Sequence, residues 1–222
     1  MGILITIDGL DGSGKQTQSE LLEKKLTELG VKARVVSFPD YESNSSALVK
    51  MYLGGEFSHD PEGVNAYAAS SFFAVDRFAS FVKDWKEDYE NGTVIIANRY
   101  TTANAIHQLS KIKGDKEREE FLSWLWDFEF GKLGIPEPDV TFFLEVPVEI
   151  SLELIRKRSE ETGREIDIHE NEGHLTASYS AAIFSAKRLS WQTIHCARNG
   201  EMRTREEISD EILERVKEKI SI

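Results

Sequence analysis

Short apolar runs rich in β-branched residues alternate along the chain with segments whose apolar residues recur at helical spacing. The runs predict buried strands at residues 2–8, 31–38, 93–98, 139–146 and 192–197. Parallel strands need crossover helices between them, so the alternation predicts an α/β sandwich of three layers. Its centre is expected to be a five-stranded, mostly parallel sheet flanked by helices. The 222 residues are expected to form one domain, residues 1–222.

Capping signals set the expected ends of the helices. Gly30 follows a helical pattern over residues 15–29, at the position where glycine commonly ends a helix. Asp60 followed by Pro61 is a typical helix start, and it predicts one long helix from there to about residue 91. One apolar stripe of that helix is expected to face the core and comprises Ala68, Phe72, Val75, Ala79 and Val82.

The charge balance and the cysteine content of the chain make some classes of protein less plausible than others. The 39 acidic side chains outnumber the 27 basic ones and give a formal net charge of −12, which disfavours coating nucleic acid by neutralising its phosphates. The single cysteine, Cys196, excludes an internal disulfide and is expected to pack within a strand rather than to react. No apolar run approaches the roughly 20 residues that span a bilayer. Because the first residues hold no basic leader, we expect a cytoplasmic protein that binds neither nucleic acid nor membrane.

A glycine-rich loop between the first strand and the first helix is the strongest chemical signal. Glycines let successive backbone N–H groups converge on phosphate oxygens, and the helix N-terminus adds partial positive charge. A lysine at the end of the loop supplies a full charge to the β- and γ-phosphates. The expected ligands of the ATP phosphates are Gly9, Leu10, Asp11, Gly12, Ser13, Gly14, Lys15, Gln16 and Thr17. The alternative interpretation is a glycine-rich turn that ends in a lysine.

One position departs from the phosphate-loop pattern. The residue after Lys15 is usually Ser or Thr, whose hydroxyl binds Mg²⁺, whereas this chain has Gln16 followed by Thr17. The glutamine amide oxygen can bind the metal, or the metal can be left to water and carboxylates. The sequence leaves both arrangements open.

A second group of residues indicates a phosphate acceptor. Arg99 follows the third strand, at the edge of a parallel sheet where ligands usually bind, and it can hold a monophosphate with two hydrogen bonds. Phe73 and Arg77 are four residues apart on one helix face, where they can stack on a base and bond its edge. Phe81 falls near the same face, so a helix buried on most sides explains the pattern equally well.

These residues together resemble the thymidylate kinase family over nearly the whole chain. Besides the loop, the motifs occur in the family's order and are Phe38-Pro39-Asp40-Tyr41, Phe73-Ala74-Val75-Asp76-Arg77, Asn98-Arg99-Tyr100 with Asn104, and Asp167-Ile168-His169-Glu170. The resemblance implies a P-loop NTPase-type fold and a kinase that transfers the γ-phosphoryl group of ATP to dTMP. The products would be dTDP and ADP, with dTDP serving dTTP synthesis for DNA replication. The family also implies Mg²⁺ and a homodimer.

The resemblance further implies a dTMP pocket, whose expected members are Asp11, Phe38, Tyr41, Phe73, Arg77, Arg99, Asn104, His107, Asp167 and His169. By position, Phe73 would stack on thymine, Arg77 would bond a base carbonyl, and Asn104 would read the base edge. His107 would crowd the ribose 2′ position, which favours deoxynucleotides.

Residues 156–170 form a polar stretch that would be the family's lid over the phosphates. The family places a catalytic arginine either in the phosphate loop or in the lid, and the loop here contains none. The candidate phosphate ligands of the lid are Arg156, Arg158 and Arg164. For the catalytic role, Arg164 is the first candidate and Arg158 the second, acting with Lys15 and Arg99. A solvated run of mixed charge is the alternative. The metal ligands that the resemblance implies are Asp11, Asp167 and Glu170.

Two positions depart from the family's pattern, which usually has Asp where Asn98 stands and an aromatic residue where His169 stands. Together with Gln16, the missing carboxylate indicates an altered metal arrangement. Rival functions are a kinase of another monophosphate, a deoxynucleoside kinase that has no need of Arg99, and a nucleotide sensor without catalytic activity.

Overall fold

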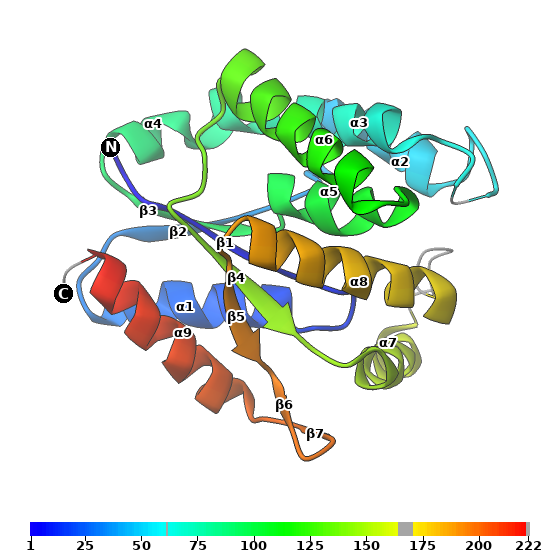
Figure 1. Cartoon of the computed structure of the whole chain (residues 1–222). Helices are drawn as coiled ribbons and strands as arrows, with labels where there is room; N and C mark the ends of the chain where they lie inside the picture. Colours follow the sequence, from blue (N-terminus) through cyan, green and yellow to red (C-terminus); the bar gives the residue numbers. More distant parts are fainter. Residues whose placement is uncertain (61, 164–170, 221–222) are drawn as a thin grey trace.

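The computed structural model describes residues 1–60, 62–163 and 171–220. A five-stranded sheet lies at the centre of the molecule (Figure 1). Its strands are β1 (Leu4–Gly9), β2 (Ala33–Ser37), β3 (Val94–Asn98), β4 (Val140–Glu145) and β5 (Gln192–His195). All neighbouring strands pair in parallel, in the order β2-β3-β1-β4-β5. The predicted five-stranded parallel sheet is therefore confirmed, with strand ends within two residues of the predicted runs.

Helices cover both faces of the sheet (Figure 1). They are α1 (Lys15–Glu28), α2 (Ala47–Leu53), α3 (Ala66–Ser80), α4 (Lys86–Glu90), α5 (Thr101–His107), α6 (Asp115–Trp126), α7 (Val148–Thr162), α8 (Glu172–Arg188) and α9 (Arg205–Ile220). Helices α1 and α9 pack on one face, and α3, α5, α6 and α8 lie on the other. After β5, the chain forms a short hairpin of β6 (Ala197–Arg198) and β7 (Glu201–Met202).

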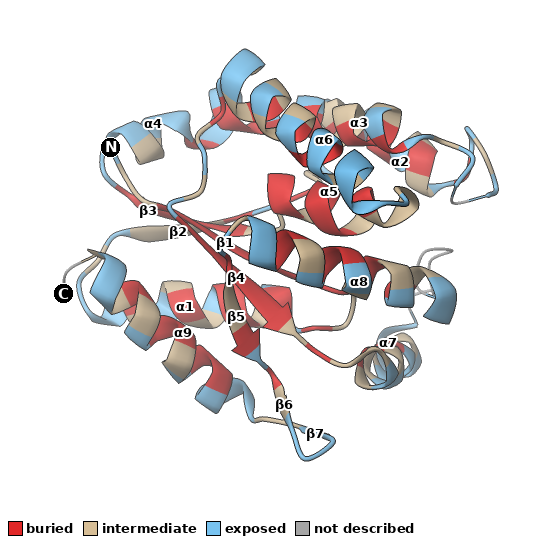
Figure 2. Cartoon of the chain, viewed as in Figure 1, coloured by how far each residue is buried: buried red, intermediate tan, exposed pale blue. Residues whose placement is uncertain are grey.

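The sheet is buried on both faces, as its red strands in Figure 2 show. On the first face, Ile5 and Ile7 of β1 pack with Leu22 of α1 and Ile212 of α9, all fully buried. On the second face, the fully buried Phe143 of β4 joins a cluster with apolar residues of α5, α6 and α8. A strand enclosed in this way needs apolar residues at nearly every position, which explains why the runs in the sequence are continuous rather than alternating.

The predicted long helix starts later than expected. The side chain of Asn65 caps α3 by accepting a hydrogen bond from the backbone N–H of Ala68, at 2.9 Å. Asp60 closes a turn instead, because its Oδ1 accepts from the N–H of Glu62 at 3.0 Å. The helix continues after α3 through a π-helical turn, η2 (Phe81–Trp85), into α4. The prediction of one long helix that begins at residue 60 is therefore wrong.

The face of this helix that packs on the core also differs from the prediction. Val75 and Val82 of the expected stripe are 46% and 51% exposed. Ala74 and Arg77 are buried in their place. The spacing of the apolar residues predicted that the stripe faces the core. In the structure Arg77 lies on the face that packs on the core, and Val75 and Val82 of the stripe are exposed to solvent.

The polar stretch predicted as a lid is helical in the part that the structure describes. Residues 156–162 complete α7, which ends at Gly163 with a φ of 69°. Asn171 then caps α8 by accepting from the N–H of His174. Within the described ranges, no helix is both long and apolar enough to cross a membrane.

Candidate active site

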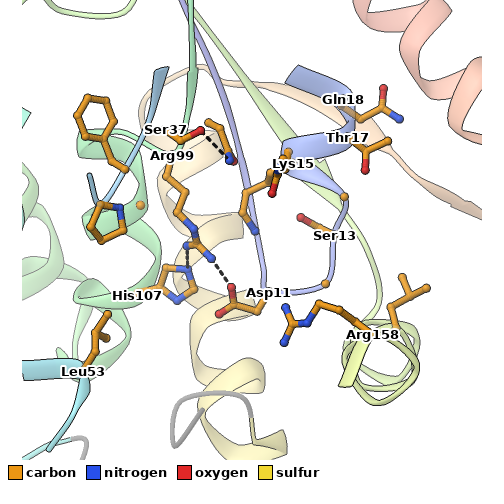
Figure 3. A pocket seen from close by; sticks show the side chains of 18 of the residues that line it. Asp11, Ser13, Lys15, Thr17, Gln18, Ser37, Leu53, Arg99, His107 and Arg158 are labelled. Atoms are coloured by element: carbon orange, nitrogen blue, oxygen red, sulfur yellow. Dashed lines mark hydrogen bonds and ion pairs between the residues drawn. The ribbon is translucent and has the colours of Figure 1, made fainter. Parts of the chain in front are cut away.

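A cavity of about 850 Å³ opens at the carboxyl ends of the central strands. The phosphate loop lines one side, and residues of α3, β3 and α5 line the other (Figure 3). The start of α9 and one face of α7 complete the wall. This is the edge of an open parallel sheet at which ligands usually bind.

The loop backbone adopts conformations that require glycine. Gly12 and Gly14 have φ values of 78° and 86°, in the left-handed region that favours glycine. A Cβ on Gly12 would also approach the carbonyl oxygen of Ser151 to 2.9 Å. Gly9 ends β1, and Leu10 is fully buried, so these two predicted ligands support the loop from behind the cavity wall. The other seven predicted phosphate ligands, residues 11–17, line the cavity.

Lys15 lies across the loop in this unliganded arrangement. Its side chain is buried, and its Nζ donates a hydrogen bond to the carbonyl oxygen of Leu10 at 2.7 Å. Burial and the nearby charge of Arg99 lower the pKa of Lys15 to about 8, while Asp11 and Asp8 oppose the shift. Lys15 is therefore charged at neutral pH, but it loses its proton more readily than an exposed lysine.

Arg99 directs its guanidinium into the cavity from the end of β3. Its φ of 65° is unusual for a residue other than glycine, and such strain is common at functional sites. Arg99 forms an ion pair with Asp11 of the loop, and its Nη1 lies 3.0 Å from Nε2 of His107 (Figure 3). Because arginine can only donate, Nε2 of His107 accepts and the ring proton lies on Nδ1. Burial holds the pKa of His107 well below its usual value, so the ring is neutral at pH 7.

Two acidic residues, Asp11 and Asp8, lie close to the cations Lys15 and Arg99. Although burial alone would raise it, the charges of Arg99 and Lys15 hold the pKa of the Asp11 carboxyl well below its ordinary value. Asp8 lies beneath the loop and is fully buried; it accepts from the Thr102 hydroxyl at 2.8 Å. Burial raises the pKa of Asp8, against the opposing influence of the same two cations. Asp11 is therefore the ionised carboxylate that faces the cavity.

The predicted base pocket is brought together at the far side of the cavity. Phe38, Tyr41, Phe73 and Asn104 all contribute to its lining. This placement favours the base-pocket interpretation of Phe73 over that of a helix buried on most sides. Arg77 is 1% exposed and also reaches the cavity wall.

A residue that the sequence prediction missed holds Arg77 in place. Glu129 lies in a π-helical turn, η4 (Asp127–Lys132), and is fully buried. Its two carboxylate oxygens accept from Nε and Nη2 of Arg77, at 2.7 and 2.6 Å. The available sequence signal was a lone carboxylate between Phe128 and Phe130, which indicates a buried charge in need of a partner.

The two unusual positions, Gln16 and Asn98, lie on the cavity wall. Gln16 is exposed, and its Nε2 donates to Glu20 one turn further along α1, at 2.9 Å. Asn98 donates from Nδ2 to the Ser37 hydroxyl at 3.3 Å. Its buried Oδ1 has no hydrogen-bond partner among the described residues. Within the same ranges, no three His, Cys, Asp or Glu side chains form a cluster that could hold a metal by themselves.

The structure describes two of the arginines in the predicted lid, Arg156 and Arg158, which both lie near the end of α7. Arg158 lines the cavity beside the phosphate loop (Figure 3), whereas Arg156 is exposed on the same helix. Arg164, Asp167, His169 and Glu170 lie outside the described residues. Near α9, the cavity is also lined by three residues that the sequence prediction did not select, namely Met202, Arg203 and Arg205.

A phosphate loop facing a second arginine site across one cavity defines a P-loop kinase of small phosphorylated acceptors. A family model described as thymidylate kinase matches residues 7–218. The chain therefore belongs to the thymidylate kinase family, whose members are nucleoside monophosphate kinases that use ATP as co-substrate. The family resemblance and the P-loop fold inferred from the sequence are confirmed.

Individual relatives agree with the family model. The thymidylate kinase of Mycobacterium tuberculosis is 29% identical over 191 residues, which cover 85% of this chain and 87% of the relative. A probable thymidylate kinase of Thermococcus gammatolerans is 30% identical over 164 residues, covering 73% and 74%. The solved thymidylate kinase of Candida albicans superposes with a TM-score of 0.72 at 21% identity, covering 98% of this chain and 92% of that one. At 21% identity, the similarity to the Candida albicans structure shows the fold alone.

Proposed function

We propose that this chain transfers the γ-phosphoryl group of ATP to dTMP, giving ADP and dTDP for dTTP synthesis. The observation that carries the proposal is a single cavity with Lys15 and the phosphate loop on one side and Arg99 with the base pocket on the other. Phosphoryl transfer needs positioning and positive charge more than covalent chemistry from the protein. In this cavity, Lys15 and Arg99 supply the positive charge, and the loop and the base pocket would position the two substrates.

Arg99 is the proposed clamp for the acceptor monophosphate. Its guanidinium is paired with Asp11 and His107. A monophosphate can accept two parallel hydrogen bonds from the same guanidinium, so dTMP would exchange with these partners. Lys15 would release the carbonyl of Leu10 in the same way and turn to the β- and γ-phosphates of ATP.

The base and sugar contacts follow from the pocket residues. Phe73 would stack on thymine, with Phe38 and Tyr41 enclosing it. Arg77 has Nη1 left to donate to the O4 carbonyl, since Nε and Nη2 are bonded to Glu129. Asn104 would read the N3 position. The neutral ring of His107 would exclude a ribose 2′-hydroxyl, which favours deoxynucleotides.

Mg²⁺ is the proposed metal, and the described residues fit it. Mg²⁺ prefers hard oxygen ligands and often takes only one or two carboxylates besides substrate phosphates. Asp11 offers an ionised carboxylate, and Asn98 offers an amide oxygen without a partner among the described residues. Asp167 and Glu170 are the further proposed ligands. The metal would neutralise charge on the phosphates during transfer.

The catalytic arginine is proposed to come from the end of α7 or from the residues that follow it. Arg158 lines the cavity beside the loop (Figure 3), and Arg164 is the candidate further along the chain. Asp167 and Glu170 are proposed to flank the sugar and the metal, and His169 is a further proposed contact of the substrate. We also propose a homodimer and a cytoplasmic location; the latter rests on the single buried cysteine, Cys196.

A substrate panel tests the proposed reaction. The protein is incubated with ATP, Mg²⁺ and either dTMP, dUMP, ribothymidine monophosphate, dCMP, dGMP or thymidine, and the products are separated by chromatography. Preferential formation of dTDP is the expected result. Product from another monophosphate would contradict the base assignment but keep the kinase. Phosphorylation of thymidine that survives Arg99→Ala would favour a nucleoside kinase, and tight nucleotide binding without any product would favour a sensor.

A further inference from the structure

Glu129 connects the two base-pocket residues Arg77 and Asn104 from behind the cavity wall. Besides Arg77, its carboxylate accepts from the hydroxyl of Thr101 at 2.8 Å and from Nδ2 of Asn104 at 3.4 Å. These partners belong to α3 and α5, whereas Glu129 belongs to η4. A fully buried carboxylate with donors on both oxygens is the usual form in which such a charge is tolerated.

Glu129 also determines which end of the Asn104 amide faces the cavity. Nδ2 of Asn104 donates to Oε1 of Glu129, and it also lies 3.3 Å from the carbonyl oxygen of Ser70. Turning the amide over would place Oδ1 against these two oxygens, which is repulsive because none of the three can donate. The amide therefore keeps Nδ2 inside and leaves Oδ1 toward the cavity that Asn104 lines.

The same carboxylate leaves one donor of Arg77 for a ligand. With Nε and Nη2 committed to Glu129, the cavity meets Nη1 of Arg77 as donor and Oδ1 of Asn104 as acceptor. Thymine and uracil match this pair, with an O4 acceptor beside an N3–H donor. Cytosine presents the opposite pair, an exocyclic amino donor beside an N3 acceptor.

We propose that Glu129 is a specificity-determining positioning residue, which orients the Asn104 amide and so makes the pocket accept thymine and reject cytosine. The inference rests on the proposed function and deepens it, because it assigns the choice of pyrimidine to a residue that does not touch the base. Arg77 can only donate and so favours the O4 carbonyl by itself, whereas a carboxylate that merely neutralised Arg77 would leave the Asn104 amide free to present either end to N3.

Glu129→Gln with two matched substrates is the first test. 5-Methyl-dCMP keeps the methyl group of dTMP and differs from it only at the hydrogen-bonding edge. Glutamine keeps the size of Glu129 but provides an NH₂ group that can face Asn104, so the Asn104 amide can turn over. The ratio of kcat/KM for dTMP to that for 5-methyl-dCMP is expected to fall at least about tenfold, mainly through a higher KM for dTMP. An unchanged ratio in folded protein would overturn the proposal.

Two control variants separate orientation from a general loss of structure. Glu137→Gln makes the same chemical change at an exposed carboxylate that accepts from Trp126, and it should leave the ratio unchanged. Thr101→Val removes a donor from Oε2 of Glu129 but keeps the charge and Oε1. It is expected to lower the melting temperature and to preserve the ratio. An equal fall of the ratio in Thr101→Val would show that loosening alone explains it, and the proposal would be wrong.

Side-chain NMR of the unmodified protein gives a test that needs neither the variant nor catalysis. With ¹⁵N-labelled asparagine side chains, the NH₂ protons of Asn104 should exchange slowly with solvent, because they face Glu129 and Ser70. Rapid exchange, at the rate of an exposed amide, would overturn the assigned orientation. Slow exchange in a protein that fails to phosphorylate dTMP would contradict the proposed function while supporting the orientation.

Discussion

Lys15 shows how burial sets the chemistry of a single residue in this site. Its ammonium is buried beside a second cation, Arg99, and its pKa is lowered to about 8. Phosphate binding needs the charged form of Lys15. Lys15 holds that form below pH 8 and loses it as the pH rises above this value, so binding of ATP above pH 8 must take up a proton.

The dissociation constant for ATP is therefore expected to change little below pH 8 and to rise toward about tenfold per pH unit above it. Isothermal titration calorimetry across this range measures it, and buffers of different ionisation enthalpy report the proton uptake. Lys15→Arg is the control, because arginine stays charged throughout; its curve should be flat even if affinity is lower. An equally flat curve for the unmodified protein would contradict the lowered pKa.

At the scale of elements, α7 carries two arginines with different surroundings. Arg158 lines the cavity and Arg156, two residues earlier, is exposed. Residues two apart point in different directions on a helix, so only one of them can serve the phosphates. The sequence placed both among the candidate phosphate ligands and named only Arg158 of the two for catalysis.

Arg158→Ala is expected to lower kcat about 100-fold, the usual effect of removing a positioned donor to the transition state. Arg156→Ala makes the same change on the solvent side of α7 and should leave kcat near that of the unmodified protein. Steady-state kinetics with saturating ATP and dTMP measure both variants. Unchanged turnover in Arg158→Ala would exclude this residue as the catalytic arginine and leave Arg164 as the candidate.

At the scale of the whole molecule, one exposed apolar surface supports the proposed homodimer. Val75 and Phe78 of α3 and Val82 of η2 are 46%, 40% and 51% exposed and recur at helical spacing. Leu48 of the neighbouring helix α2 is 42% exposed. Contiguous apolar patches of this kind commonly mark association surfaces. Because each of these side chains is already about half buried, covering the rest would contribute roughly 1 kcal/mol each, about half of the value for a full burial.

Val75→Glu is expected to convert a dimer into a monomer, because it places a charge within this surface. Sedimentation velocity at micromolar concentration measures the change. Ile183→Glu is the matched control, since Ile183 is 40% exposed on α8, outside the surface formed by α2, α3 and η2. A monomeric unmodified protein, or dissociation by both substitutions alike, would contradict an interface at α3.

The sequence by itself determined the features that depend on neighbouring residues. Continuous apolar runs predicted the five strands because both faces of the sheet are enclosed. The phosphate loop was predictable because Gly12 and Gly14 must adopt left-handed conformations at fixed spacing from Lys15. The order of motifs was sufficient to indicate the family, which the comparisons then confirmed.

Only the tertiary structure decided how distant segments meet. Arg99 pairs with Asp11 across 88 positions, and Arg77 pairs with Glu129 across 52. No local pattern encodes such pairs, because they depend on which helix faces pack together around the sheet. The same packing turned Arg77 inward and Val75 outward, against their hydrophobicity, because a charge that is paired with Glu129 can be buried.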